Sequence, residues 1–133
     1  IKQAFEIKAK ILQIRELDAG MSIGYNSLWT AAEKSRIAVL NVGYGDGTLK
    51  TSDRNASVYV GGHIAKVVGK TSMDMIAVDI TDPKFDKVSI NDFAEILGSN
   101  ITLEMVAENS TLRHYELMTG IGRRYNKIYN LKA

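Results

Sequence analysis

Apolar and polar residues alternate in short runs along this chain, and alternation of this kind predicts β-strands. The run 5–17 alternates as far as Ile11 and then slips in phase, which predicts a half-buried strand with a bulge after that residue. Residues 35–42 are apolar on both faces at their centre and predict a central strand. The same reasoning predicts further strands at 56–60, 64–68, 75–80, 87–90 and 125–131.

Turn residues separate these runs. Gly61, Gly62 and His63 join two of the predicted strands, and so short a connection favours a β-hairpin with His63 exposed in its loop. Residues 91–98 fit either a helical turn or a strand. Short strands with turns about every ten residues predict a mainly β fold, an antiparallel β-barrel or sandwich-like domain.

Two short helices are expected near the C-terminus of this β domain. Thr102 can act as the N-cap of a helix over 103–108. Ser110 or Thr111 can begin a second helix that ends with Met118. Two helices this short leave the prediction of a mainly β fold unchanged.

Composition and charge narrow the functional classes. The 133 residues suffice for a single domain over 1–133, and 45% of them are hydrophobic and 24% charged, as in ordinary globular proteins. The net charge is +2 with Lys and Arg scattered, which argues against nucleic acid as a partner. No apolar run reaches the roughly 18 residues that a membrane helix needs, and no signal-peptide pattern opens the chain. We therefore expect no membrane association and a cytoplasmic location.

The residue types and their spacing argue against a metal site and against a catalytic triad. The chain has no cysteine, which excludes disulfides and thiolate metal sites. Its two histidines, His63 and His114, have no serine or second ligand at catalytic spacing. The sequence therefore predicts neither a catalytic triad nor a metal site.

Three glycine-containing motifs carry the candidate chemistry. Tyr25 lies between Gly24 and Asn26, which predicts a tight turn that can present the phenol to a partner. A phenol has a pKa of about 10, so it acts as a base only where its surroundings lower that pKa. The motif 43–47, Gly-Tyr-Gly-Asp-Gly, lacks the Lys-Ser/Thr pair and the helix of a phosphate-binding loop. The third motif, 69–74, reads Gly-Lys-Thr-Ser-Met-Asp.

In order and spacing, these motifs resemble the C-terminal domain of alanine racemase, a fold-type III enzyme that uses pyridoxal phosphate. The stretches 101–104, 115–119 and 122–124 agree with the same family, so the resemblance covers nearly the whole chain. Members usually carry Arg where this chain has Lys70, and often where it has Lys50. Lysine keeps the positive charge at both positions and loses the bidentate fork of arginine.

The resemblance implies a role for four residues. Tyr25 would be the catalytic base on the L-alanine side, supplied to the active site of the other subunit of a homodimer. Met73 would bind the substrate carboxylate through its backbone N–H, and Tyr44 would line the channel to the active site. Arg123 is a candidate for contact with the cofactor phosphate, and the alternative is an arginine in a surface ion pair.

The resemblance also implies a missing partner domain. In the family, a preceding barrel domain binds pyridoxal phosphate through a lysine, and that lysine is the base on the D-alanine side. Because the chain begins with Ile1, we expect a fragment of a longer protein that lacks this barrel and is inactive alone. The full enzyme would interconvert L- and D-alanine and so supply D-alanine for peptidoglycan.

Other functions stay open on the sequence alone. One is the β-domain of a racemase with broader amino-acid specificity, and another is a non-catalytic β-barrel that only binds a partner. A decarboxylase of the same fold type would need a cysteine at the cross-subunit site, and the chain has none. An enzyme requires Tyr25, Tyr44 and Met73 at one rim of the domain, whereas a binding module leaves them on unrelated surfaces.

Overall fold

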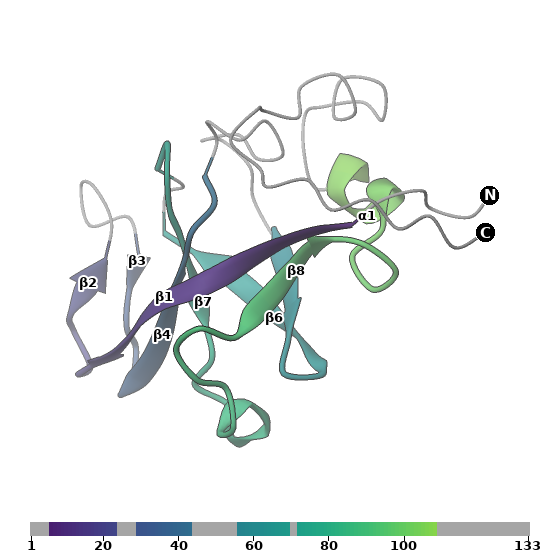
Figure 1. The fold of residues 1–133 in the computed structure, drawn as a ribbon. Coiled ribbons are helices and arrows are strands. Elements are labelled where there is room, and N and C mark those ends of the chain that lie inside the picture. The colour runs from purple at the N-terminus through teal and green to yellow at the C-terminus, as the bar shows by residue number, and fades with distance from the viewer. Residues whose placement is uncertain (1–5, 24–28, 44–55, 70–71, 109–133) are drawn as a thin grey trace, which may run out of the picture.

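Six antiparallel strands form a closed barrel in the computed structural model, which describes residues 6–23, 29–43, 56–69 and 72–108 (Figure 1). The barrel order is β1-β4-β7-β6-β5-β8, and β2 and β3 form a separate small sheet outside it. The strands are β1 (Ile7–Leu17), β2 (Ser22–Ile23), β3 (Trp29–Thr30), β4 (Ser35–Leu40), β5 (Ser57–Val60), β6 (His63–Val68), β7 (Ile76–Asp79) and β8 (Phe93–Leu97). The prediction of a mainly β fold is confirmed, and of the two predicted architectures, barrel and sandwich-like, the structure shows a barrel.

The long strand β1 closes the barrel because it pairs with two neighbours. Its first residues pair with β8, in a register that includes Lys10 opposite Phe93. Its later residues pair with β4, and the register shifts between Ile11 and Gln13. The predicted bulge is therefore confirmed, and it is the corner at which β1 passes from one neighbour to the other.

The bulge also changes which side chains of β1 face the interior. Ile7, Ala9 and Ile11 point into the barrel and belong to its core, whereas Leu17 belongs to a second cluster outside it. The central strand β4 contributes to both, because Leu40 lies in the barrel core and Ile37 in the second cluster. Burial on both faces confirms the interpretation of this run as a central strand.

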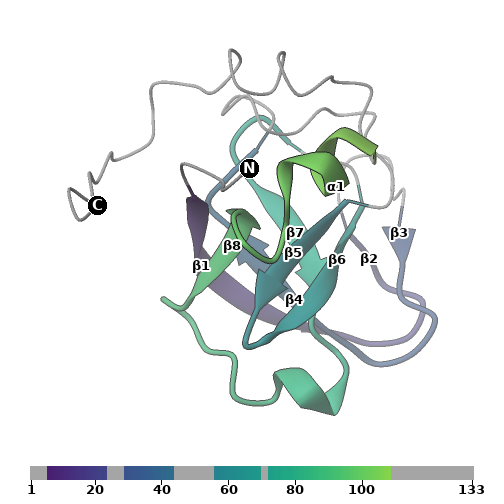
Figure 2. The same cartoon turned by 90° about the vertical axis from the view of Figure 1, so that its right-hand side faces the viewer.

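A 3-10 helix, Pro83–Phe85, closes the lower end of the barrel (Figure 2). The Arg36 guanidinium on β4 donates to the backbone carbonyls of Phe85 at 3.0 Å and Val88 at 2.7 Å. The predicted strand at 87–90 is wrong. There the backbone is paired locally, since Val88 N–H donates to the Phe85 carbonyl and Ser89 N–H to the Asp92 carboxylate.

The β5–β6 hairpin forms as predicted, with Gly61 and Gly62 at φ +59° and +83°. His63 is exposed as expected, but it is the first residue of β6 rather than part of the loop. Residues 93–97, for which a helical turn and a strand were both possible, form β8.

The helix α1 (Leu103–Glu108) follows the predicted N-cap, since the Thr102 hydroxyl accepts a hydrogen bond from Met105 N–H at 3.2 Å. It lies at the end of the molecule opposite the 3-10 helix (Figure 2). The second predicted helix, through Met118, and the predicted strand at 125–131 lie outside the described residues.

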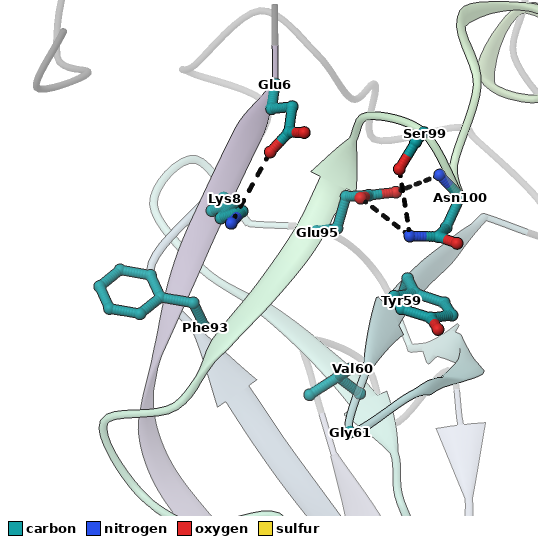
Figure 3. Close-up of a pocket in the computed structure, with 9 residues that line it drawn as sticks. All are labelled: Glu6, Lys8, Tyr59, Val60, Gly61, Phe93, Glu95, Ser99 and Asn100. Atoms are coloured by element: carbon teal, nitrogen blue, oxygen red, sulfur yellow. Dashed lines mark hydrogen bonds and ion pairs between the residues drawn. The ribbon is translucent and has the colours of Figure 1, made fainter. Parts of the chain in front are cut away.

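A buried carboxylate fixes the turn that leads from β8 into α1 (Figure 3). Glu95 is 7% exposed, and one of its oxygens accepts from the backbone N–H groups of Asn100 at 2.8 Å and Ile101 at 2.6 Å. The other oxygen accepts from the Asn100 side-chain amide at 3.2 Å. A Cβ at Gly98 would lie 2.6 Å from the carboxyl carbon, so only glycine lets this side chain fold over the turn.

Removing this carboxylate should destabilise the domain. Glu95→Ala leaves two backbone donors without their acceptor, which predicts a loss of about 2–4 kcal/mol in the free energy of unfolding in urea. Glu6→Ala is the matched control: its carboxylate pairs with Lys8 at 3.7 Å and is half exposed, so its loss should cost below about 1 kcal/mol. Equal losses in the two variants would contradict the role given to Glu95.

Candidate functional site

The strands on either side of Tyr25 in the sequence are paired. Ile23 at the end of β2 pairs with Trp29 at the start of β3, and residues 24–28 lie between them in the sequence. Ile23 and Trp29 both pack on the second cluster, the group centred on Leu17, Ala31 and Ile37. Val68 and Ala77, at the adjoining ends of β6 and β7, pack on the same cluster, which fixes the hairpin against this end of the barrel.

Gly69, which directly follows β6, lies beside the β2–β3 hairpin. Its φ of +71° lies in the left-handed region, which glycine occupies without the penalty of a side chain. A Cβ built at Gly69 would lie 3.6 Å from both Cγ1 and the carbonyl oxygen of Ile23, an ordinary contact. The third motif thus begins beside the residue two positions before Tyr25.

The loop containing Met73 is closed by Ser72. Ser72 N–H donates to the Met75 carbonyl at 3.1 Å, and Met75 N–H donates to the Ser72 hydroxyl at 3.0 Å. That hydroxyl also donates to the Met75 carbonyl at 2.9 Å. Met73 is 54% exposed, so its side chain is not part of the core.

Gly43 brings the second motif against this loop. A Cβ at Gly43 would lie 2.5 Å from the carbonyl carbon of Met73 and closer still to the carbonyl oxygens of Ser72 and Met73. Two backbone segments therefore touch at a distance that no other residue type allows. Tyr44 is the next residue along the chain.

The described parts of the three motifs are thus adjacent at one rim of the barrel. We call Ile23, Gly43, Gly69 and the loop 72–75 the loop rim. Met73 belongs to it. The side chains of the other predicted site residues and of the two substituted lysines lie outside the described residues: Tyr25, Tyr44, Arg123, Lys50 and Lys70.

A second candidate site is a polar groove of about 350 Å³ on the outer face of β1, β8 and β5 (Figure 3). Tyr59 and Phe93 line it, together with the Glu6–Lys8 pair and the Glu95 turn. Among the described residues that line the groove, the one cationic side chain, Lys8, already pairs with Glu6, and there are two carboxylates, Glu6 and Glu95. This charge distribution disfavours the binding of a dianionic phosphate. The barrel interior is filled by apolar side chains. This groove and the barrel interior therefore do not fit the phosphate of pyridoxal phosphate.

Two further observations concern the described residues only. No group of three His, Cys, Asp or Glu side chains comes together there in a way that could hold a metal ion. None of the helices in this part of the chain has the length and apolar character needed to cross a membrane.

A small antiparallel barrel that brings the described flanks of three glycine-containing motifs to one rim is the class of domain that the structure defines. The family model described as alanine racemase, C-terminal domain, matches residues 4–129. The chain belongs to this family, and the resemblance seen in its motifs is confirmed.

Relatives in sequence are alanine racemases of greater length. The chain is 36% identical over 128 residues to alanine racemase of Alteromonas mediterranea, a match that covers 96% of this chain and 35% of the relative. A match of 36% identity to the enzyme of Shewanella amazonensis covers 93% of this chain and 34% of the relative. The chain therefore spans only part of these enzymes.

Solved structures agree with the barrel. The biosynthetic alanine racemase of Pseudomonas aeruginosa aligns with a TM-score of 0.89 at 32% identity, over 97% of this chain and 36% of that one. Alanine racemase of Bartonella henselae, solved with covalently bound pyridoxal phosphate, aligns with a TM-score of 0.88 at 35% identity, over 94% and 34%.

Two positions escaped the sequence reasoning. The sequence identifies Gly43 and Ser72 only as members of their motifs, although both set the geometry of the loop rim. Glycine next to a candidate site residue was the available signal for Gly43. A serine three residues before Met75 was a weaker signal for a closed loop.

Cross-linking can test whether the predicted residues share this rim. The chain has no cysteine, so the pair Tyr25→Cys and Met73→Cys supplies the only thiols. A short bismaleimide should join them within one chain, detected as a cyclised peptide by mass spectrometry. The pair Tyr25→Cys and His63→Cys is the control, because His63 lies at the opposite end of β6 from Gly69. Linkage of the control pair alone would contradict the shared rim.

Proposed function

We propose that this chain is the C-terminal domain of an alanine racemase and supplies Tyr25 as a proton-transfer residue to the active site of a partner subunit. One observation of the structure supports this most: the flanks of the three motifs meet at the loop rim. There the second and third motifs pack backbone against backbone, and the start of the third lies beside the flank of the first. Membership of the family gives the chemistry that such a rim would serve.

Inversion at Cα requires a proton to leave one face and another to arrive at the opposite face. A single base cannot reach both faces of a bound substrate, so two groups are needed. Tyr25 would act on the L-alanine face, from the tip of the hairpin that β2 and β3 form. Rigid packing of this hairpin on the second cluster would hold the phenol in place, and the pKa of the phenol would be set by groups outside this chain.

Substrate orientation would come from the neighbouring loops. The Met73 backbone N–H would donate to the substrate carboxylate, a charge-assisted contact that a change of side chain tests poorly. Tyr44, next to Gly43, would line the channel and limit the size of the substrate. In the alternative, a racemase with broader specificity, the channel would admit amino acids with larger side chains than alanine.

Pyridoxal phosphate would be held by the preceding barrel domain. When bound, it stabilises the negative charge left on Cα after the proton leaves. A contact from Arg123 to the cofactor phosphate, a homodimer and a cytoplasmic location belong to the same proposal.

Removing the phenol hydroxyl should affect one face only. In the full-length enzyme, Tyr25→Phe should lower proton abstraction from L-alanine by about 10²–10⁴-fold, the usual contribution of a positioned acid or base. The measurement is deuterium exchange at Cα in D₂O, followed separately from each enantiomer. D-alanine should still exchange, since its proton is removed by the lysine of the barrel.

The matched control for this experiment is Tyr59→Phe. Tyr59 also carries a phenol but lies on β5 beside the polar groove, so its exchange rates should equal those of the wild type. An equal loss from both enantiomers in Tyr25→Phe would show that Tyr25 has no face-specific role.

A further inference from the structure

The contact between Gly43 and the loop 72–75 is the tightest glycine packing of backbone on backbone in the described residues. Ordinary contact with a Cβ needs 3.4–4 Å, whereas a Cβ at Gly43 would lie 2.5 Å from the Met73 carbonyl carbon. Gly43 is itself buried, so an added methyl group has no solvent-facing escape. Relief requires the segment after β4 and the loop to separate by about 1 Å, since backbone cannot rotate away as a side chain can.

The loop responds as a unit because Ser72 closes it. Three hydrogen bonds between Ser72 and Met75 tie its two ends together within four residues. Pressure on the Ser72 and Met73 carbonyls therefore displaces the whole loop rather than one peptide. The backbone N–H of Met73 lies between the two contact points.

We propose that Gly43 and Ser72 are positioning residues for substrate binding: Gly43 sets how closely the loop 72–75 approaches the rim, and Ser72 sets its shape. The inference rests on the proposed function, in which the Met73 N–H meets the substrate carboxylate. It assigns a role to two residues that would not touch the substrate. Affinity for the carboxylate depends on both, because a hydrogen bond to a charged group weakens steeply with misplacement.

The test uses Gly43→Ala in the full-length enzyme. Displacement of the loop should raise KM for L-alanine about tenfold or more and change kcat less, since a misplaced donor weakens binding before and during the reaction alike. Hydrogen–deuterium exchange supplies a readout that does not depend on activity. Amides of residues 72–75 should exchange faster in Gly43→Ala than in the wild type.

Gly62→Ala is the matched control. Gly62 adopts a positive φ, +83°, which Gly43 does not, but a Cβ there meets nothing within 4 Å, and it lies in the hairpin at the opposite end of β6. Alanine at this positive φ should lower the free energy of unfolding by about 1 kcal/mol, but it does not displace the loop rim. Its KM and the exchange of residues 72–75 should match the wild type.

If Gly43→Ala does not fold, Ser72→Ala tests the inference instead. This variant removes the two hydrogen bonds of the Ser72 hydroxyl with Met75 and adds no steric clash. A raised KM with faster exchange of the loop supports the inference. Wild-type KM and exchange in both Gly43→Ala and Ser72→Ala overturn it while leaving the racemase proposal intact. A wild-type enzyme that does not racemise alanine refutes the proposed function, and the exchange data then still report whether Gly43 sets the loop.

Discussion

The structure depends on one long strand serving two neighbours. β1 pairs with β8 over its first residues and with β4 over the rest, and the bulge after Ile11 lets it turn between them. Without that turn the sheet would stay open and leave unpaired edges. The same bulge reverses the alternation of β1, so that Ile14 packs against the barrel core and Leu17 lies on the outer face in the second cluster.

The second cluster links the fold to the candidate site. It holds the β2–β3 hairpin against the ends of β6 and β7, so Ile23, two residues before Tyr25 in the sequence, lies beside Gly69. Gly43 then brings the end of β4 onto the loop with Met73. The geometry of the loop rim therefore depends on closure of the barrel, on the second cluster and on the packing at Gly43 and Gly69.

Sequence patterns predicted the parts of the fold that depend on local signals. The bulge in β1, the Gly61-Gly62 hairpin and the Thr102 cap each follow from a few adjacent residues. The pattern failed at 87–90, where the Arg36 guanidinium, distant in sequence, holds the chain in a turn. The Gly43 contact was also beyond prediction, because it joins backbones 30 residues apart whose approach only the closed barrel defines.

The central claim is that the rim serves the active site of the other subunit. Complementation tests it most directly: full-length Tyr25→Phe is mixed and refolded with a variant that lacks the cofactor lysine of the barrel domain. Each parent should have at most a small residual activity. The account predicts that mixed dimers regain racemase activity, because one of their two sites then combines an intact lysine with an intact Tyr25. Mixed dimers that form and stay inactive would contradict it, since Tyr25 would then act on the site of its own chain.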